Sequence, residues 1–218
     1  MSQSVKRPYT STRRQAQAGE TRLRIIRAAD QLFVAQGYGR TTIAEIAAAA
    51  GASVETVYAA FRNKPTLLRQ VWYLNFRGDE KDIRLVDRPE VRAVLADPDL
   101  PTRFGKHAVV VTGVFRRIAP LLAALQGAAA TEPAAAAMLA EWNEGRLDAC
   151  TRYAAAAAAT GQLAVSETEC RDVLAATMDG ALWQRLVAER GWSDERFADW
   201  LGRLWTSQLV KLRGPRER

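Results

Sequence analysis

Residues 41–61 constrain the fold of this chain more than any other segment, because they predict two short helices joined by a tight turn. Thr42 stands before the first helix with Glu45 three residues later, a spacing that lets each side chain bond a free main-chain N–H of the other. Gly51 ends this helix, because glycine turns the chain at positive φ at little cost. One face of the helix is small and apolar, made by Ile43, Ile46, Ala47 and Ala50.

The second short helix follows Ser53, a favoured capping residue, and turns Val57 and Phe61 inward. Two helices of this length bury too little surface to be stable alone, so they need a third. Residues 20–36 predict that third helix, which ends at Gly37-Tyr38-Gly39. Its long amphipathic stripe consists of Leu23, Ile26, Ala29, Leu32, Phe33 and Gln36. A helix followed by such a pair is typical of domains that place a helix in the DNA major groove.

Many spaced positions between Thr21 and Leu68 add to this pattern. They are Ala28-Ala29, Leu32-Phe33, Gly37-Tyr38, Thr41-Thr42-Ile43, Ile46-Ala47, Gly51, Ser53, Thr56-Val57-Tyr58, Phe61, Asn63-Lys64 and Leu67-Leu68. With them the segment resembles the TetR family of bacterial transcriptional regulators. The resemblance implies an all-α homodimer whose N-terminal domains bind a palindromic operator in double-stranded DNA. It also implies a C-terminal domain that senses a small molecule and then releases the DNA.

Positive charge is concentrated beside the helix-turn-helix. Residues 1–64 hold ten Lys/Arg and four Asp/Glu, whereas residues 65–218 hold 21 and 20. Almost all of the net charge of +7 therefore lies in the N-terminal region. Basic residues there favour DNA, because neutralising phosphates releases bound counterions. The alternative is that a basic N-terminus only aids solubility.

We expect three regions along the chain. Residues 1–18 predict a flexible basic arm, residues 19–64 a helix-turn-helix DNA-binding domain, and residues 65–213 a helical domain for ligand binding and dimerisation. The arm either reaches the DNA backbone or minor groove or is disordered without a function. Its basic residues are Lys6, Arg7, Arg13 and Arg14.

The remaining helices are predicted from periodicity and from prolines and glycines. A fourth helix, residues 64–78, has Pro65 in its first turn and links the two domains. Pro120 must kink or split an apolar helix over 102–129. The other predicted helices cover residues 89–96, 133–160, 166–190 and 194–212. Because alternating apolar runs are missing, the sequence predicts an all-α fold.

The predicted DNA-binding residues lie at helix starts. They are Thr42, Ser53, Val54, Glu55, Thr56, Tyr58 and Lys64. The resemblance implies that four of them contact phosphates: Thr42, Thr56, Tyr58 and Lys64. Val54 is expected to pack on a thymine methyl, and Glu55 to accept from a cytosine amino group. Alternatively, Tyr58 is partly core and Thr42 only a cap. The recognition helix lacks Arg, Lys, Asn and Gln before Arg62, so DNA shape would contribute to specificity.

A ligand pocket is predicted inside the helical bundle. Its lining residues are Trp72, Phe76, Phe104, His107, Val111, Phe115, Met138 and Trp142. These side chains suit a largely apolar or aromatic effector, although each is also compatible with ordinary core. Arg103 and Lys106 beside His107 leave an acidic ligand as an alternative. A lone histidine does not indicate a metal site, so we expect no metal and no cofactor.

The last two predicted helices carry wide apolar faces, which favour a four-helix dimer interface with a second copy. The interface residues are predicted to be Val173, Leu174, Thr177, Met178, Ala181, Gln184, Trp200, Leu201, Leu204 and Trp205. The alternative is that these helices only close the core of one protomer.

Other classes of protein are disfavoured by what the sequence lacks. It has no Gly-rich phosphate loop and no nucleophile elbow, so we expect no catalytic residues and no enzyme. Two cysteines, Cys150 and Cys170, favour a reducing cytoplasm over a disulfide scaffold. Residues 1–18 lack the apolar core of a secretory signal, and charges and prolines interrupt the apolar stretches, so we expect no membrane partner. The favoured function is a ligand-responsive repressor, with an architectural DNA-binding protein without a ligand as the alternative.

Overall fold

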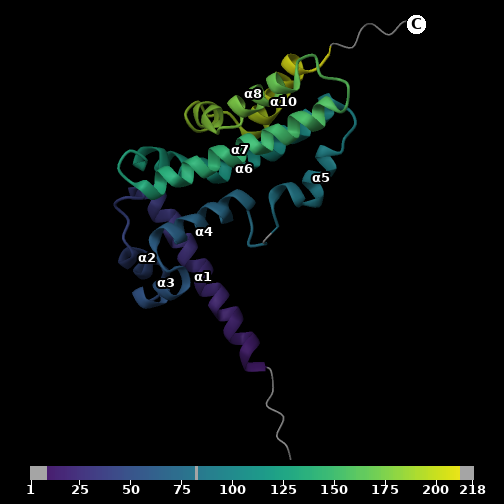
Figure 1. The fold of residues 1–218 in the computed structure, drawn as a ribbon. Helices are drawn as coiled ribbons and strands as arrows, with labels where there is room; N and C mark the ends of the chain where they lie inside the picture. The colour runs from purple at the N-terminus through teal and green to yellow at the C-terminus, as the bar shows by residue number, and fades with distance from the viewer. Residues whose placement is uncertain (1–8, 82, 212–218) are drawn as a thin grey trace, which may run out of the picture.

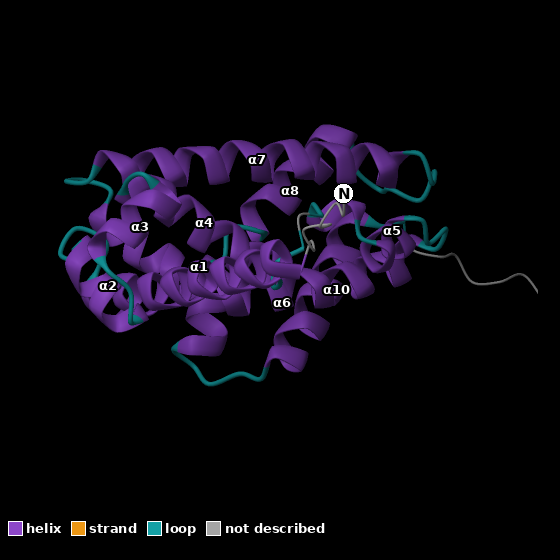
Figure 2. Ribbon diagram, turned by 90° about the horizontal axis from the view of Figure 1, so that it is seen from below, coloured by secondary structure: helices purple, strands orange, loops and turns teal. Residues whose placement is uncertain are grey.

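The computed structural model describes residues 9–81 and 83–211, which form helices joined by loops (Figures 1 and 2). The all-α prediction is confirmed over these residues. The helices are α1 (Tyr9–Gln36), α2 (Ile43–Ala50), α3 (Val54–Phe61), α4 (Lys64–Arg77), α5 (Pro89–Leu95), α6 (Leu100–Ala128), α7 (Pro133–Ala158), α8 (Glu167–Thr177), α9 (Ala181–Trp183) and α10 (Asp194–Leu209). A 3₁₀ turn at Leu85–Asp87 precedes α5, and a π turn at Gln184–Ala188 follows α9.

The first three helices enclose a small core at one end of the molecule (Figure 1). Phe33 from α1, Ile46 from α2 and Phe61 from α3 are almost fully buried there. Each of these helices is amphipathic and too short or too polar to be stable alone, so packing around this shared core stabilises all three.

Helix α1 is longer than predicted. It begins at Tyr9, so residues 9–18, assigned from sequence to a flexible arm, are helical, and that prediction is wrong for them. The rest of the predicted arm, with Lys6 and Arg7, lies outside the described residues. Residues 14–20 are exposed on every side, which explains why apolar periodicity gave no signal for this part of the helix.

Helix α4 connects the two ends of the molecule, as predicted. The Asn63 side chain caps its start by accepting from the Thr66 N–H at 2.8 Å, and Gly78 ends it at a φ of 83°. Leu67, Leu68 and Val71 are buried between α1 and α6. This helix therefore belongs to the cores of both domains, and the boundary between residues 64 and 65 stays a prediction.

Helix α6 is the central helix of the C-terminal bundle and packs on α10, α7 and α4. It continues through Pro120 without a break, because the proline lies on the exposed face of the helix. Of the predicted kink or split at Pro120, the split is therefore wrong. By length and composition α6 could span a membrane, but more than half of its apolar window is buried inside the bundle.

The predicted helix over 166–190 is interrupted in the structure. Helix α8 ends at Thr177, and Gly180 adopts a φ of 86° before the short α9 and the π turn. A Cβ atom at Gly180 would lie 3.2 Å from a methyl of Leu122, so close packing on α6 as well as positive φ requires glycine here. Helix α10 follows Ser193 as predicted and ends at Leu209, earlier than the predicted residue 212.

Candidate nucleic-acid interface

Reciprocal hydrogen bonds close the first turn of α2. The Glu45 N–H donates to Thr42 Oγ1 at 3.2 Å, and the Thr42 N–H donates to Glu45 Oε2 at 2.7 Å. These bonds hold the pKa of Glu45 below its ordinary value. The predicted capping box is confirmed, and it leaves the exposed Thr42 at a helix start that favours an anion.

The turn between α2 and α3 has the geometry of a helix-turn-helix. Gly51 adopts a φ of 60°, and Ser53 Oγ accepts from the Thr56 N–H at 3.1 Å to cap α3. The directions of α2 and α3 differ by 105°, within the range typical of this motif, about 90–120°. The local sequence therefore positions the start of α3 at an exposed edge of the domain.

Most of the predicted DNA-binding side chains face solvent together at this edge. Thr42, Ser53, Glu55, Thr56 and Tyr58 are exposed, and Tyr58 retains half of its accessible surface. An aromatic side chain left so exposed, with a hydroxyl at its tip, is available for a phosphate. Val54 is different, because it is half-buried and packs against the core. The contacts of all these residues with DNA stay predictions.

Lys64 points to the turn between α1 and α2. Its Nζ donates to the Gly39 carbonyl at 3.3 Å and lies 4.3 Å from the centre of the Tyr38 ring. Burial lowers the pKa of Lys64, while the carboxylates of Glu132 and Glu45 oppose that shift. A phosphate contact by Lys64 therefore requires the ammonium group to leave these partners or to share them.

Three arginines near the helix-turn-helix were missed by sequence reasoning. Arg40 and Arg62 are exposed, and Arg62 is the one non-glycine residue in the described chain with positive φ, at 62°. Arg22 is buried in part, with Nη1 donating to the Ala60 carbonyl at 2.9 Å and the guanidinium 4.4 Å from the Phe61 ring. Their positive charge was visible in the sequence, but no spacing rule indicated that Arg40 and Arg62 are exposed or that Arg22 packs on α3.

The C-terminal bundle holds α4 from the side through α7. Glu141 accepts from Tyr73 Oη at 3.0 Å and forms an ion pair with Arg69, also at 3.0 Å. The neighbouring Trp142 ring packs edge-on against two α4 rings, Trp72 at 5.3 Å and Phe76 at 5.6 Å. A displacement of α7 would therefore be transmitted to α4.

A second contact holds the carboxyl end of α4. Arg117 of α6 donates from Nε to the Asn75 carbonyl at 2.8 Å and from Nη2 to the Phe76 carbonyl at 3.2 Å. A cation at a helix C-terminus also interacts favourably with the helix dipole. Asn75 in turn donates from its side chain to Asp30 of α1 at 2.8 Å, so α1, α4 and α6 are joined at this point.

The predicted pocket residues form two separate aromatic groups. Trp72, Phe76 and Trp142 lie between α4 and α7, as described above. Phe104 and His107 instead pack on Trp205, with ring centres 6.0 and 5.7 Å apart. Burial lowers the pKa of His107 to about 4, so the imidazole is neutral. Met138, Val111 and Phe115 are also buried in the core. A ligand site among these residues stays a prediction.

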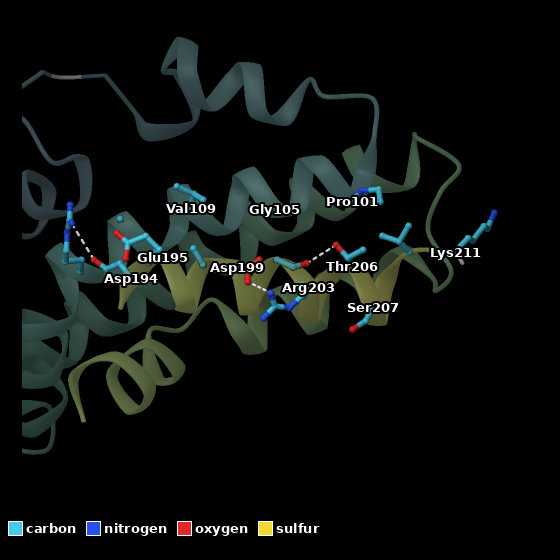
Figure 3. Close-up of a pocket in the computed structure, with 16 residues that line it drawn as sticks. Pro101, Gly105, Val109, Asp194, Glu195, Asp199, Arg203, Thr206, Ser207 and Lys211 are labelled. Atoms are coloured by element: carbon cyan, nitrogen blue, oxygen red, sulfur yellow. Dashed lines mark hydrogen bonds and ion pairs between the residues drawn. The ribbon is translucent and has the colours of Figure 1, made fainter. Parts of the chain in front are cut away.

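A broad groove of about 980 Å³ lies elsewhere, between α6 and α10 (Figure 3). Gly105, Val109 and Ala198 contribute apolar surface to it, and the charged Asp199–Arg203 ion pair also lines it. None of the eight predicted pocket residues lines this groove. Periodicity could not reveal it, because it results from the close approach of two helices with small residues between them.

The predicted dimer residues divide by burial. Leu174, Met178, Leu201 and Trp205 are buried inside the protomer, and their place in a dimer interface stays a prediction. The other six are half-buried and stay predictions: Val173, Thr177, Ala181, Gln184, Trp200 and Leu204.

Neither metal-binding nor thiol chemistry finds support in the described residues. They contain no group of three or more His, Cys, Asp or Glu side chains able to hold a metal ion. Cys150 and Cys170 are free and buried, and burial raises the pKa of each thiol to about 11. Both thiols are therefore protonated and unreactive at neutral pH.

Comparison with known proteins agrees with this geometry. Residues 25–71 match the family model for bacterial regulatory proteins of the tetR family, a stretch that covers α2, α3, the C-terminal part of α1 and the N-terminal part of α4. No curated protein matches the chain.

Solved structures share the fold over most of the chain. SmeT in complex with triclosan is 22% identical, with a TM-score of 0.66, and the match covers 88% of this chain and 92% of SmeT. NalD of Pseudomonas aeruginosa, the secondary repressor of the MexAB-OprM multidrug efflux pump, is 22% identical, with a TM-score of 0.65 and coverages of 89% and 98%. A transcriptional regulator from Saccharomonospora viridis in complex with choline is 19% identical, with a TM-score of 0.65 and coverages of 89% and 100%.

Residues 25–71, which contain the capped helix-turn-helix, are thus similar to the bacterial regulatory proteins of the tetR family, and the all-helical fold of the chain is shared with solved structures of transcriptional regulators.

Proposed function

We propose that the protein is a cytoplasmic repressor that binds a palindromic operator as a homodimer and releases it when a small molecule binds the C-terminal bundle. The observation that carries the proposal is the position of α4. Its first residue, Lys64, contacts the turn between α1 and α2 of the DNA-binding domain. Farther along, α4 is held by Arg117 of α6 and by Trp142 of α7. A change in the bundle would therefore reach the DNA-binding edge through one rigid helix.

DNA binding is supported by the exposed edge at the start of α3. Its hydroxyl groups and the two capped helix ends suit phosphates, and the basic N-terminal region suits their charge. A dimer follows from the palindrome that the family resemblance implies. The two recognition helices must then stand about 34–36 Å apart, or a multiple of that distance, to enter successive major grooves.

A largely apolar or aromatic effector is supported by the aromatic rings between α4 and α7, where Trp142 packs on Trp72 and Phe76. The related structures with triclosan and with choline also place small molecules in proteins of this fold. A ligand between α4 and α7 would separate Trp142 from Trp72 and Phe76 and so move α4. To weaken DNA binding tenfold, it must favour the released conformation by about 1.4 kcal/mol.

The experiment begins with operator selection from random duplexes, followed by titration of the selected operator at several salt concentrations. A screen for apolar compounds that release the operator then identifies an effector. We expect Trp142→Ala to change the effector concentration needed for release by at least tenfold while operator affinity without effector changes little. Trp192→Ala is the matched control, since Trp192 lies in the loop before α10 and packs on Trp200 of that helix, away from α4.

Two results would contradict the proposal. A protein that binds all duplexes equally and responds to no compound would be an architectural DNA-binding protein. A Trp142 variant that loses operator affinity but keeps a normal effector response would show that this ring only supports the DNA-binding domain.

A further inference from the structure

The first turns of α1 project beyond the rest of the molecule. Figure 1 shows this helix running past α2 and α3, away from the C-terminal bundle. All side chains from Arg14 to Glu20 are exposed, and a Cβ atom added at Gly19 would meet nothing within 4 Å. Residues 9–20 therefore extend the domain by about 18 Å, at 1.5 Å per helical residue.

From Arg14 to Glu20 the side chains of this extension are exposed, so burial does not stabilise these turns. A helix that is polar on every side gains nothing from burial, and an isolated helix of this length is marginal in water. Its sequence, YTSTRRQAQAGE, includes a glycine and lacks an apolar stripe, so it does not suit a hydrophobic groove or a lipid surface. A partner that contacts a polar helix would stabilise it.

The charge of the segment identifies that partner. Residues 1–19 contain Lys6, Arg7, Arg13 and Arg14 and no acidic residue, and the first turn of α1 likewise has none. A polyanion complements this charge, and Gln15 and Gln17 can donate hydrogen bonds to its oxygens.

The extension is also fixed relative to the recognition helix. Just after it, Arg22 holds the end of α3 through the Ala60 carbonyl and the Phe61 ring. The same continuous helix thus connects the α3 contact with the projecting turns, on the side of the molecule remote from the bundle (Figure 1). DNA seated on α3 would lie within reach of these turns.

We propose that residues 9–20 bind the phosphate backbone of duplex DNA beside the site occupied by α3. The inference rests on the proposed DNA-binding function and adds a second contact to it. The projecting length corresponds to about five base pairs, at 3.4 Å each. This contact is independent of base sequence, because phosphates carry none.

The test uses the full-length protein and a 40-base-pair duplex of mixed sequence. Binding constants are measured by fluorescence anisotropy between 50 and 200 mM salt. The double variant Arg13→Ala with Arg14→Ala should flatten the plot of log K against log [salt] by about 2, since each phosphate contact contributes roughly 0.9. Its nuclease footprint on a selected operator should also shorten.

The charge control is Arg152→Ala with Arg203→Ala, which removes two exposed arginines from the C-terminal bundle. It should keep the wild-type slope. The conformation control compares Ala16→Pro with Ala16→Ser, at an exposed position where proline breaks the helix without disturbing the core. Ala16→Pro should lose the same part of the slope, and Ala16→Ser should not.

The outcomes separate this inference from the proposed function. Wild-type protein that binds no duplex would refute the proposed function. Wild-type binding with an unchanged slope in the double-arginine variant would refute only the contact by the extension. An unchanged slope in Ala16→Pro would show that the helical conformation of the extension is not required for the contact. If the double-arginine variant bound DNA like wild type but no longer bound anionic vesicles that the wild type binds, the extension would contact a membrane surface and the inference would be wrong.

Discussion

Arg117 and Asn75 meet where the carboxyl end of α4 touches α6, with the guanidinium Nε 2.8 Å from the Asn75 carbonyl oxygen. Gly78 is required beside this contact, since a Cβ atom there would lie 2.9 Å from the same Nε atom and since its φ is 83°. Asp30 completes the arrangement by accepting from the Asn75 side chain. One side chain of the bundle thus fixes the helix that connects both domains.

We expect Arg117→Ala to reduce the free energy of unfolding by about 1–3 kcal/mol, because it removes two charge-assisted bonds and leaves partly buried carbonyls without a donor. Urea denaturation at a fixed protein concentration measures the change. Arg116→Ala is the matched control, since Arg116 is largely exposed and pairs with Asp194 at 3.4 Å. It should change stability by less than about 0.5 kcal/mol. Equal losses in both variants would show that the α4 contact contributes nothing specific.

Local signals in the sequence predicted much of this fold. The capping box at Thr42 and Glu45, the turn at Gly51 and the cap at Ser53 depend on residues within three or four positions of one another, so spacing alone revealed them. The break at Gly180 was missed because packing on Leu122, 58 positions earlier in the chain, decides it. The start of α1 was missed because a helix exposed on all sides has no apolar period.

The site was predicted less completely than the fold. Residues at the start of α3 could be named because helix ends and phosphates follow general rules. The aromatic residues expected to share one pocket instead divide between Trp142 and Trp205, since only tertiary packing decides which rings meet. Arg117 gave no signal at all, because its partners are main-chain carbonyls rather than charged side chains.

Acid should destabilise the protein partly through His107. This imidazole is buried against Tyr153, with ring centres 4.4 Å apart, and burial lowers its pKa from 6.5 to about 4. Between these values the unfolded chain binds a proton that the folded protein does not, so stability falls as pH decreases from 6.5 to 4. The loss from this group is on the order of 3 kcal/mol. Urea denaturation at pH 7 and at pH 4.5 should show a smaller difference for His107→Phe than for wild type. A pH dependence unchanged by the substitution would mean that other groups cause it.

Replacing Arg62 should separate backbone strain from DNA binding. Its φ of 62° strains any residue with a Cβ, so Arg62→Gly should raise the free energy of unfolding by about 1 kcal/mol, whereas Arg62→Ala should not. Both variants lose the exposed guanidinium, so both should flatten the salt dependence of DNA binding by about 0.9. Thermal denaturation and anisotropy titrations measure the two effects. If Arg62→Ala gained as much stability as Arg62→Gly, strain at this position would be excluded.

The crossing of α6 and α10 should tolerate a methyl group on one helix only. A Cβ atom at Gly202 of α10 would lie 2.9 Å from the Gly105 Cα atom, against main chain that cannot rotate away, whereas one at Gly105 meets nothing within 4 Å. Gly202→Ala should therefore destabilise the protein by about 1–3 kcal/mol. Gly105→Ala should instead gain up to about 1 kcal/mol, because alanine is the better helix former.

Gly145→Ala provides the baseline for both glycine variants, since Gly145 lies within α7, is exposed and has no neighbour that its Cβ would touch. All three are compared by urea denaturation at one protein concentration, which keeps any contribution of dimerisation constant. A Gly202→Ala protein as stable as Gly145→Ala would show that α10 moves away from α6 at little cost. In that case the packing of α10 would not hold α6, which carries Arg117, and the support that α6 gives to α4 would have to come from its contacts with α7 and α4.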